Sequence, residues 1–161
     1  MKLYLLRHGH SPTAHEAGVP TDAERPLSDQ GIESLKSTFD ELRRNGAHPA
    51  LIIHSSLKRA RQTAQEAQKS FGLSGDLKEC PCLSEQSSPE QLFEALLPEL
   101  IKAGEVLAIG HQPQLGEVTS WLTGRDAGTI SPGGVVALEI KESGASSLKG
   151  STAKRLWSFN P

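Results

Sequence analysis

The segment Leu3-Tyr4-Leu5-Leu6-Arg7-His8-Gly9 begins as an apolar run and ends abruptly in a cation, an imidazole and a glycine. The apolar part predicts a buried strand. Arg7 offers a planar fork of donors that matches phosphate oxygens in pairs, and Gly9 permits close backbone approach. An imidazole such as His8 can attack phosphorus and carry the phosphoryl group covalently. The segment indicates an anion site, although it also fits a strand end with a solvated arginine and a capping histidine.

Composition limits the class of protein. The chain has 161 residues, and we expect one domain over 1–161 that buries a core without disulfides or metals. Seventeen Lys and Arg oppose nineteen Asp and Glu for a net charge of -2, so no global field favours nucleic acid or an acidic membrane as a partner. No apolar run could cross a bilayer, and Met1-Lys2 leads into a strand rather than a signal peptide. We therefore expect a cytoplasmic protein.

The cysteines and histidines do not predict a metal site. Cys80 and Cys82 lie two residues apart on a predicted strand and would share a face, which suits neither a disulfide nor a four-ligand zinc site. We expect them to pack as small buried hydrophobes. His8, His10 and His15 lie near one another, but no ordered pattern of carboxylates accompanies them. The chain is therefore expected to need no metal or other cofactor.

Strand-like and helix-like segments alternate along the chain, which is typical of an α/β protein with a largely parallel sheet. Strands are predicted at 2–6, 51–53, 77–82 and 106–109, with a late antiparallel pair at 134–140 and 153–159 across a Ser/Gly-rich turn at 143–151. Helices are predicted from the cap Ser28 to before Gly46, from Leu57 to Phe71, after the capping box Ser88-Pro89-Glu90-Gln91, and from Pro113 to before Gly124. Pro98 is expected to kink or break the third helix.

Three of these predicted strands end in the same kind of chemistry. The first ends at Arg7-His8-Gly9, the strand at 51–53 leads into the segment 55–61, and the strand at 106–109 ends at Gly110-His111-Gln112. Ligands of open α/β sheets bind outside the carboxyl ends of the strands. Residues distant in sequence are therefore expected to converge there.

The segment after the second strand places cations where a helix disfavours them. Lys58, Arg59 and Arg61 fall in a first helical turn, whose free N–H groups and dipole already make it positive. An anion bound at the helix start would offset the unfavourable electrostatic energy of these cations. Arg59 shares a helix face with Thr63, so we predict that Arg59 alone contacts the anion while the other two cations are solvated.

Gly110-His111 contains the same residue types as His8-Gly9 at the end of the first strand, but in the reverse order. The glycine permits close approach, and the histidine follows at a predicted helix start, where the dipole lowers an imidazole pKa. A bound phosphate dianion would raise it. His111 can donate a hydrogen bond in either protonation state.

Three motifs together resemble the histidine phosphatase superfamily, whose fold is called phosphoglycerate mutase-like. They are Leu5-Leu6-Arg7-His8-Gly9, the stretch 55–63 with sequence SSLKRARQT, and Gly110-His111. The chain length, the RPLSDQG segment at 25–31 and the lack of a large insertion make the chain most similar to the phosphohistidine phosphatase SixA group. The resemblance implies a three-layer α/β/α sandwich around a mostly parallel sheet.

The resemblance also implies roles for single residues. His8 matches the nucleophile that becomes phosphorylated, Arg7 and Arg59 match the arginines that hold the phosphoryl oxygens, and His111 matches the second histidine of the pocket. The candidate substrate-binding residues are Gly9, Ser11, Arg25 and Gln112.

One departure from the family concerns the general acid. Many relatives place a carboxylic acid in the loop after the third strand, but here the segment 83–89 is short. Glu85 is the candidate acid, and we favour its interpretation as a solvated loop carboxylate. A phosphoramidate such as phosphohistidine has less need of an acid than an alkyl ester. We therefore predict a metal-independent phosphatase acting on a phosphorylated protein, such as a histidine phosphotransfer domain. The alternatives are a small-molecule phosphomonoesterase that uses Glu85 and a non-catalytic module that binds a phosphoprotein.

Overall fold

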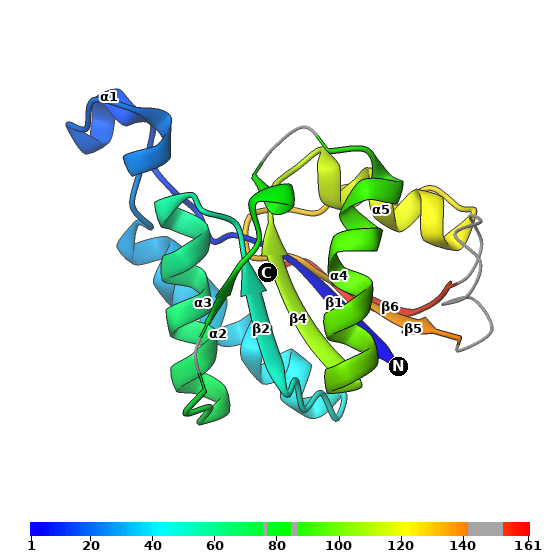
Figure 1. Cartoon of the computed structure of the whole chain (residues 1–161). Helices are drawn as coiled ribbons and strands as arrows, with labels where there is room; N and C mark the ends of the chain where they lie inside the picture. Colours follow the sequence, from blue (N-terminus) through cyan, green and yellow to red (C-terminus); the bar gives the residue numbers. More distant parts are fainter. Residues whose placement is uncertain (76, 85–86, 142–152) are drawn as a thin grey trace.

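A computed structural model describes residues 1–75, 77–84, 87–141 and 153–161 (Figure 1). These ranges contain a six-stranded sheet in the order β3-β2-β4-β1-β5-β6. The strands are β1 (Lys2–Arg7), β2 (Leu51–His54), β3 (Lys78–Glu79), β4 (Glu105–Gly110), β5 (Val135–Ile140) and β6 (Ala153–Phe159). β3, β2, β4 and β1 are parallel neighbours, and β5 and β6 add antiparallel pairs. The predicted mostly parallel sheet and late antiparallel pair are confirmed, while the turn at 143–151 lies within the segment that is not described.

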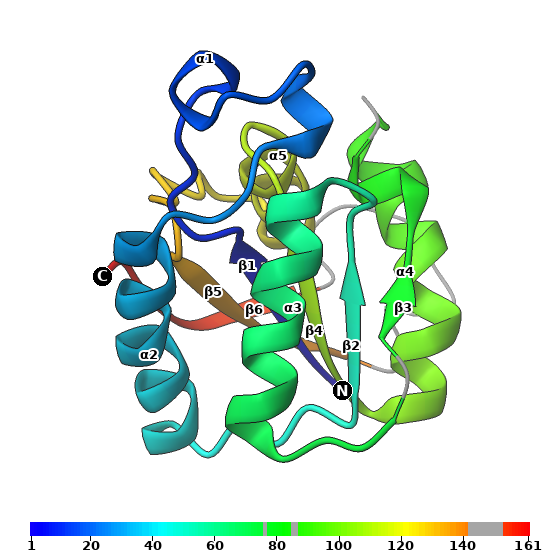
Figure 2. The same ribbon diagram turned by 90° about the vertical axis from the view of Figure 1, so that its left-hand side faces the viewer.

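Helices cover both faces of this sheet. The α-helices of the described ranges are α1 (Ala14–Ala17), α2 (Asp29–Arg44), α3 (Lys58–Phe71), α4 (Pro89–Ala103) and α5 (Gln114–Thr123), and short 3₁₀ helices occupy Asp22–Glu24 and Pro81–Leu83. Figure 2 shows α2 and α3 in front of the sheet, with α5 behind it. The three-layer α/β/α sandwich is therefore confirmed.

The alternation of side chains along β1 produces two cores. Leu3 and Leu5 pack in the cluster that includes the apolar residues of α4 and α5, whereas Tyr4 and Leu6 pack in the cluster of α2 and α3. Successive strand residues point to opposite faces, so a continuous apolar run is what a strand between two helical layers requires. No helix of the described ranges has the length and apolar character to span a bilayer.

Local capping signals position the helices as predicted. Ser28 accepts a hydrogen bond from the Gly31 amide at the start of α2, and Ser88 forms a capping box with Gln91 at the start of α4. The predicted break at Pro98 is wrong, because α4 continues through this residue to Ala103. Three leucines on its inner face, Leu92, Leu96 and Leu100, are fully buried. Their packing holds the helix together across the one backbone donor that proline lacks.

The predicted strand at 77–82 is mostly wrong. β3 contains only Lys78–Glu79, and a 3₁₀ helix begins at Pro81, which cannot donate to a strand ladder. Cys80 and Cys82 therefore do not share a strand face. Both thiols are free and partly buried against the core on the α4 and α5 side, in agreement with a packing role.

Candidate active site

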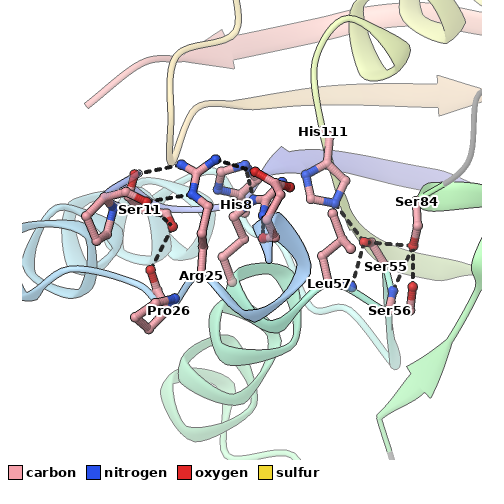
Figure 3. Close-up of polar contacts among 12 residues, drawn as sticks. His8, Ser11, Arg25, Pro26, Ser55, Ser56, Leu57, Ser84 and His111 are labelled. Carbon is pink, nitrogen blue, oxygen red and sulfur yellow. Dashed lines mark hydrogen bonds and ion pairs between the residues drawn. The ribbon is translucent and has the colours of Figure 1, made fainter. Parts of the chain in front are cut away.

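His8 and His111 meet at the carboxyl ends of the central strands (Figure 3). Arg7 ends β1 and pairs in register with Gly110 at the end of β4, so the residues that follow these strands start at the same level. The ring centroids of His8 and His111 lie 4.9 Å apart. Arg59 reaches the same place from the first turn of α3. Figure 2 shows α1 and its loop above these strand ends.

His8 is held in a single neutral tautomer. Its Nδ1 lies 2.7 Å from the carbonyl oxygen of Gly9, which can only accept, so Nδ1 carries the proton. Its Nε2 accepts a hydrogen bond from Nε of Arg59 at 3.2 Å. Burial lowers the pKa of His8 to about 3, and the neighbouring positive charges act in the same direction. His8 is therefore neutral near pH 7, with a lone pair on Nε2.

Arg59 is 7% exposed and is oriented by a residue that the sequence analysis missed. Its Nη1 donates to the carbonyl oxygen of Asp22 at 2.8 Å, and its Nη2 donates to the Asp22 carboxylate at 3.0 Å. The same carboxylate accepts from Arg25 at 2.7 Å. Arg25 and Arg59 hold the pKa of Asp22 below its usual value. The i,i+3 spacing of Asp22 and Arg25 was the available signal, because it permits an ion pair across one turn.

Arg7 and His111 each bring an unsatisfied donor or acceptor to this region. Arg7 donates from Nη1 to the Ile130 carbonyl at 2.9 Å, which anchors its side chain. Nε of Arg7 and Nδ1 of His111 are buried and have no hydrogen-bond partner among the described residues. Buried polar atoms without partners are costly. An oxyanion placed beside His8 could accept from both.

His111 is fixed by a serine to which the sequence analysis assigned no role. Nε2 of His111 lies 2.7 Å from Oγ of Ser55, which is fully buried at the end of β2. Burial lowers the pKa of His111 to about 4, and the charges of Arg59 and Arg7 add to this effect. Both histidines of the site are thus neutral in the unliganded protein near pH 7.

The loop residues predicted to bind substrate are engaged in structural contacts. The Ser11 hydroxyl donates to the Pro26 carbonyl at 2.7 Å. Arg25 donates to the Pro12 carbonyl at 2.6 Å and to the Ser11 carbonyl at 2.9 Å, besides its ion pair with Asp22. These contacts tie the loop together. Arg25 is linked to the site through Asp22, and a direct role in binding substrate remains a prediction.

Gly9 and Gln112 also satisfy local structural demands. A Cβ atom on Gly9 would lie 3.0 Å from Leu35 and 3.1 Å from the Gly31 carbonyl oxygen, so close packing against α2 requires a glycine. The Gln112 side chain accepts from the Gly116 amide at 3.0 Å and thereby satisfies the first turn of α5. Glu85, the candidate acid, lies outside the described residues.

Two recesses flank the segment Gln112-Pro113 beside the site. One, of about 620 Å³, is lined by His111, Gln112, Glu117 and polar uncharged side chains including Ser84, Ser87 and Gln91. The other, of about 630 Å³, contains Arg7, Glu117 and Asp126 in its wall. Their described lining residues include no lysine, and Arg7 is the sole arginine among them. The described walls of the two recesses are thus neutral to acidic.

A metal site at the histidines would need partner side chains that complete it in the described part of the chain. Within the ranges that the structure describes, no group of three or more His, Cys, Asp and Glu side chains could hold a metal ion. Nδ1 of His10 pairs instead with the Ser28 hydroxyl at 2.8 Å.

A buried neutral imidazole near two arginines lies at the carboxyl ends of the parallel strands, and a family model places such a chain in a known class. The model of the histidine phosphatase superfamily (branch 1) matches residues 3–92, and the chain belongs to this superfamily.

Comparison with solved structures places the fold more closely. The chain is similar to the protein histidine phosphatase SixA complexed with tungstate, with a TM-score of 0.86 and 20% identity over 100% of this chain and 97% of that one. It is also similar to a putative alpha-ribazole-5'-P phosphatase from Escherichia coli str. K-12 substr. MG1655, with a TM-score of 0.70 and 20% identity over 100% and 97%. At these identities the likeness shows a shared fold.

A sequence relative is found over nearly the full length. An uncharacterized protein of Picosynechococcus sp. strain PCC 7002 is 28% identical over 98% of this chain and 94% of its own.

Proposed function

We propose that the protein is a phosphatase that works in two steps through a phosphorylated His8. The observation that carries this proposal is the tautomer of His8, whose Nε2 holds the in-plane lone pair of the ring. In the unliganded protein Arg59 donates to this lone pair, and attack requires the phosphoryl group to take the place of that contact. In the first step Nε2 attacks phosphorus in line, and the bond from phosphorus to the leaving atom breaks. Water then attacks the phosphorus of phospho-His8, releases inorganic phosphate and returns the lone pair to Nε2.

The remaining residues of the site stabilise the transferring group. Arg7, Arg59 and His111 surround His8 with donors that suit the equatorial oxygens of the phosphoryl group. In phosphoryl transfer, positioning and electrostatic stabilisation supply most of the acceleration. The fixed contacts of Arg59 with Asp22 and of Arg7 with Ile130 hold these donors in place.

The proposed substrate is a phosphohistidine on a protein, such as a histidine phosphotransfer domain. Among the described residues, Arg7 is the sole Lys or Arg side chain that lines the two recesses, so this part of the lining holds no second cation for an anionic group elsewhere on a small substrate. The likeness to the protein histidine phosphatase SixA supports the same substrate class. Phosphohistidine also suits a site whose nearby carboxyl group, Asp22, is ion-paired with Arg25 and Arg59 and has a lowered pKa, which makes it a poor proton donor.

A small phosphomonoester is the second candidate substrate. The likeness to an alpha-ribazole-5'-P phosphatase supports it, because that fold also serves a small molecule. In this case Glu85 would be the candidate acid.

The test compares both substrate classes with wild type, His8→Ala and Glu85→Gln in the presence of EDTA. We expect the wild type to dephosphorylate a phosphohistidine protein faster than alkyl phosphates, with acid-labile phosphate trapped on the enzyme but absent from His8→Ala. Loss of ester turnover in Glu85→Gln together with a preference for esters would favour the second candidate. Absence of turnover with every phosphorylated compound would favour a binding module, and loss of activity on chelation would contradict the metal-independent mechanism.

A further inference from the structure

A chain of serine hydroxyls leads from the surface to His111 (Figure 3). Ser56 is exposed, Ser84 is half-buried and Ser55 is fully buried. The Oγ atoms of Ser56 and Ser84 lie 2.8 Å apart, those of Ser84 and Ser55 lie 2.9 Å apart, and Ser55 Oγ lies 2.7 Å from Nε2 of His111. The chain is therefore continuous from solvent to the imidazole.

The donors around Ser55 constrain where its proton lies. Its Oγ also accepts from the Leu57 amide at 3.2 Å, and this contact can run in only one direction. A hydroxyl has one proton and two lone pairs. The Ser55 Oγ also accepts from the Ser84 hydroxyl, so with three contacts the single proton of Ser55 points to Nε2 of His111.

The same constraint applies to Ser84. Its Oγ accepts from the Ser56 amide at 2.9 Å and donates to Ser55, so its second lone pair accepts from the Ser56 hydroxyl. The three hydroxyls are consequently oriented as a set. In the first arrangement, which the structure shows, all donate toward His111, whose proton then sits on Nδ1. Transfer of one proton along the chain to Nε2 of His111 gives the second arrangement, in which all donate away from His111 and its Nδ1 has a lone pair.

The two arrangements give Nδ1 of His111, at the buried end of the chain of hydroxyls, opposite hydrogen-bonding roles. Nδ1 of His111 is the buried ring nitrogen without a partner among the described residues, and its ring faces His8 at 4.9 Å between centroids. The first arrangement offers a proton donor to a group bound at His8. The second offers an acceptor at the same point.

We propose that Ser55 and Ser84 form a proton relay that lets His111 supply a proton to the leaving group and later take one from the attacking water. This inference rests on the proposed function. It identifies Ser55 and Ser84 as positioning residues that act through His111, and it provides an acid where the Asp22 carboxyl group is held ionised by Arg25 and Arg59.

The relay balances over the two steps. As the bond from Nε2 of His8 to phosphorus forms and the bond to the leaving atom breaks, the Nδ1 proton of His111 moves to the leaving atom. Nε2 of His111 takes the proton of Ser55, which is replaced through Ser84 and Ser56 from solvent. When water attacks phospho-His8, Nδ1 accepts a proton from it and the chain returns one proton to solvent.

The first test compares two aryl phosphates that differ in their need for a proton. Dinitrophenolate leaves without protonation, whereas phenolate benefits from it. General acid catalysis contributes about 100-fold or more, so Ser84→Ala should lower kcat/KM for phenyl phosphate by about 100-fold and for 2,4-dinitrophenyl phosphate by no more than about threefold. Ser84→Thr keeps a hydroxyl and should restore both rates, and the exposed, distant Ser74→Ala is the control.

The outcomes separate the relay from the proposed function. If Ser84→Ala slows both substrates equally while the wild type is active, the serine has only a structural role and the relay is wrong. If the wild type turns over neither substrate and forms no phospho-His8, the proposed function fails and the relay fails with it.

A second measurement does not depend on turnover. Nitrogen-15 NMR of the tungstate-bound protein should show the proton of His111 on Nδ1 and an unprotonated, hydrogen-bonded Nε2, because the bound anion accepts. Ser55→Ala should abolish the hydrogen-bond shift of Nε2. A neutral His111 that carries its proton on Nε2 with the anion bound would overturn the proposal.

Discussion

The Nε–H group of Arg59 donates to Nε2 of His8 across 3.2 Å. On the other side of the ring, Nδ1 donates to the Gly9 carbonyl. Both contacts select the same tautomer, so the attacking nitrogen is specified by the backbone and by an arginine together. In the proposed mechanism, Arg59 keeps the lone pair of His8 on Nε2 and then binds the phosphoryl group that His8 accepts.

The phosphoryl group is expected on Nε2 of His8. Nδ1 has its proton engaged with Gly9 and lacks a free lone pair. Phosphorus-31 NMR of the acid-labile intermediate should therefore give the signal of the Nε2-phosphorylated isomer, and His8→Ala should give none. An Nδ1-phosphorylated product would contradict the tautomer described here.

Replacing Arg59 should be far more damaging than replacing Arg61. Arg59 is buried against His8, whereas Arg61 is exposed on the same helix. Removal of a donor that stabilises transition-state charge costs about 100- to 1000-fold, so Arg59→Ala should lower kcat/KM by that factor while Arg61→Ala changes it less than about threefold. Equal effects of the two substitutions would argue against the clamp.

Acid should destabilise the native protein through His8. Its pKa is about 3 when folded and about 6.5 when unfolded, so between these values the unfolded chain binds more protons and stability falls as pH falls. One such group contributes roughly 2 kcal/mol of loss between pH 7 and pH 5. Urea unfolding should show this additional loss in wild type relative to His8→Ala. Parallel pH dependence in the two proteins would show that His8 is not buried as a neutral ring.

Neutralising Asp22 should strengthen oxyanion binding. Its carboxylate occupies one donor of Arg59, and its side chain is 62% exposed. Ion pairs at such sites contribute about 0.2–1 kcal/mol, so Asp22→Asn should tighten tungstate binding by up to about fivefold in calorimetry. Glu24→Gln in the same 3₁₀ helix is the matched control, because Glu24 contacts Thr21 rather than an arginine. Weaker binding in Asp22→Asn would mean that orientation of Arg59 outweighs the competing charge.

Gly9→Ala should lower the free energy of unfolding by about 1–3 kcal/mol, as overpacked cores do. The added methyl would approach Leu35 and the Gly31 carbonyl at 3.0 and 3.1 Å. Gly75→Ala serves as control, since a Cβ there meets no atom within 4 Å. A stable Gly9→Ala protein with weak tungstate binding would instead favour close approach of the anion to the backbone.

Periodic segments allowed the fold and the position of Arg59 to be predicted. Helical spacing distinguished it from Lys58 and Arg61, and the structure buries Arg59 alone of the three. The contact of Arg59 with Asp22 could not be predicted, because the loop that carries Asp22 has no periodic pattern and its path depends on tertiary contacts. The continuity of α4 through Pro98 likewise depends on core packing. The rule that proline interrupts a helix considers only the local backbone and so could not predict it.

The hydroxyl chain beside His111 was missed for a related reason. Ser55 lies in a motif that drew attention through its cations, and Ser84 lies in the loop predicted to follow the strand at 77–82. Their contact joins residues 29 positions apart. It becomes visible only when the 3₁₀ helix at Pro81–Leu83 brings the two segments together.

Arg7 pairs with Gly110 in the register of β1 and β4. The positions of the site residues that follow these strands therefore depend on how the two strands are aligned. A shift of β1 by one residue against β4 would move His8 by about 3.3 Å and turn its side chain to the opposite layer. Partly folded forms that keep their helices but lose this alignment would therefore be unable to transfer phosphoryl groups. Catalytic rate in this protein should thus report the order of its sheet more sensitively than helical content does.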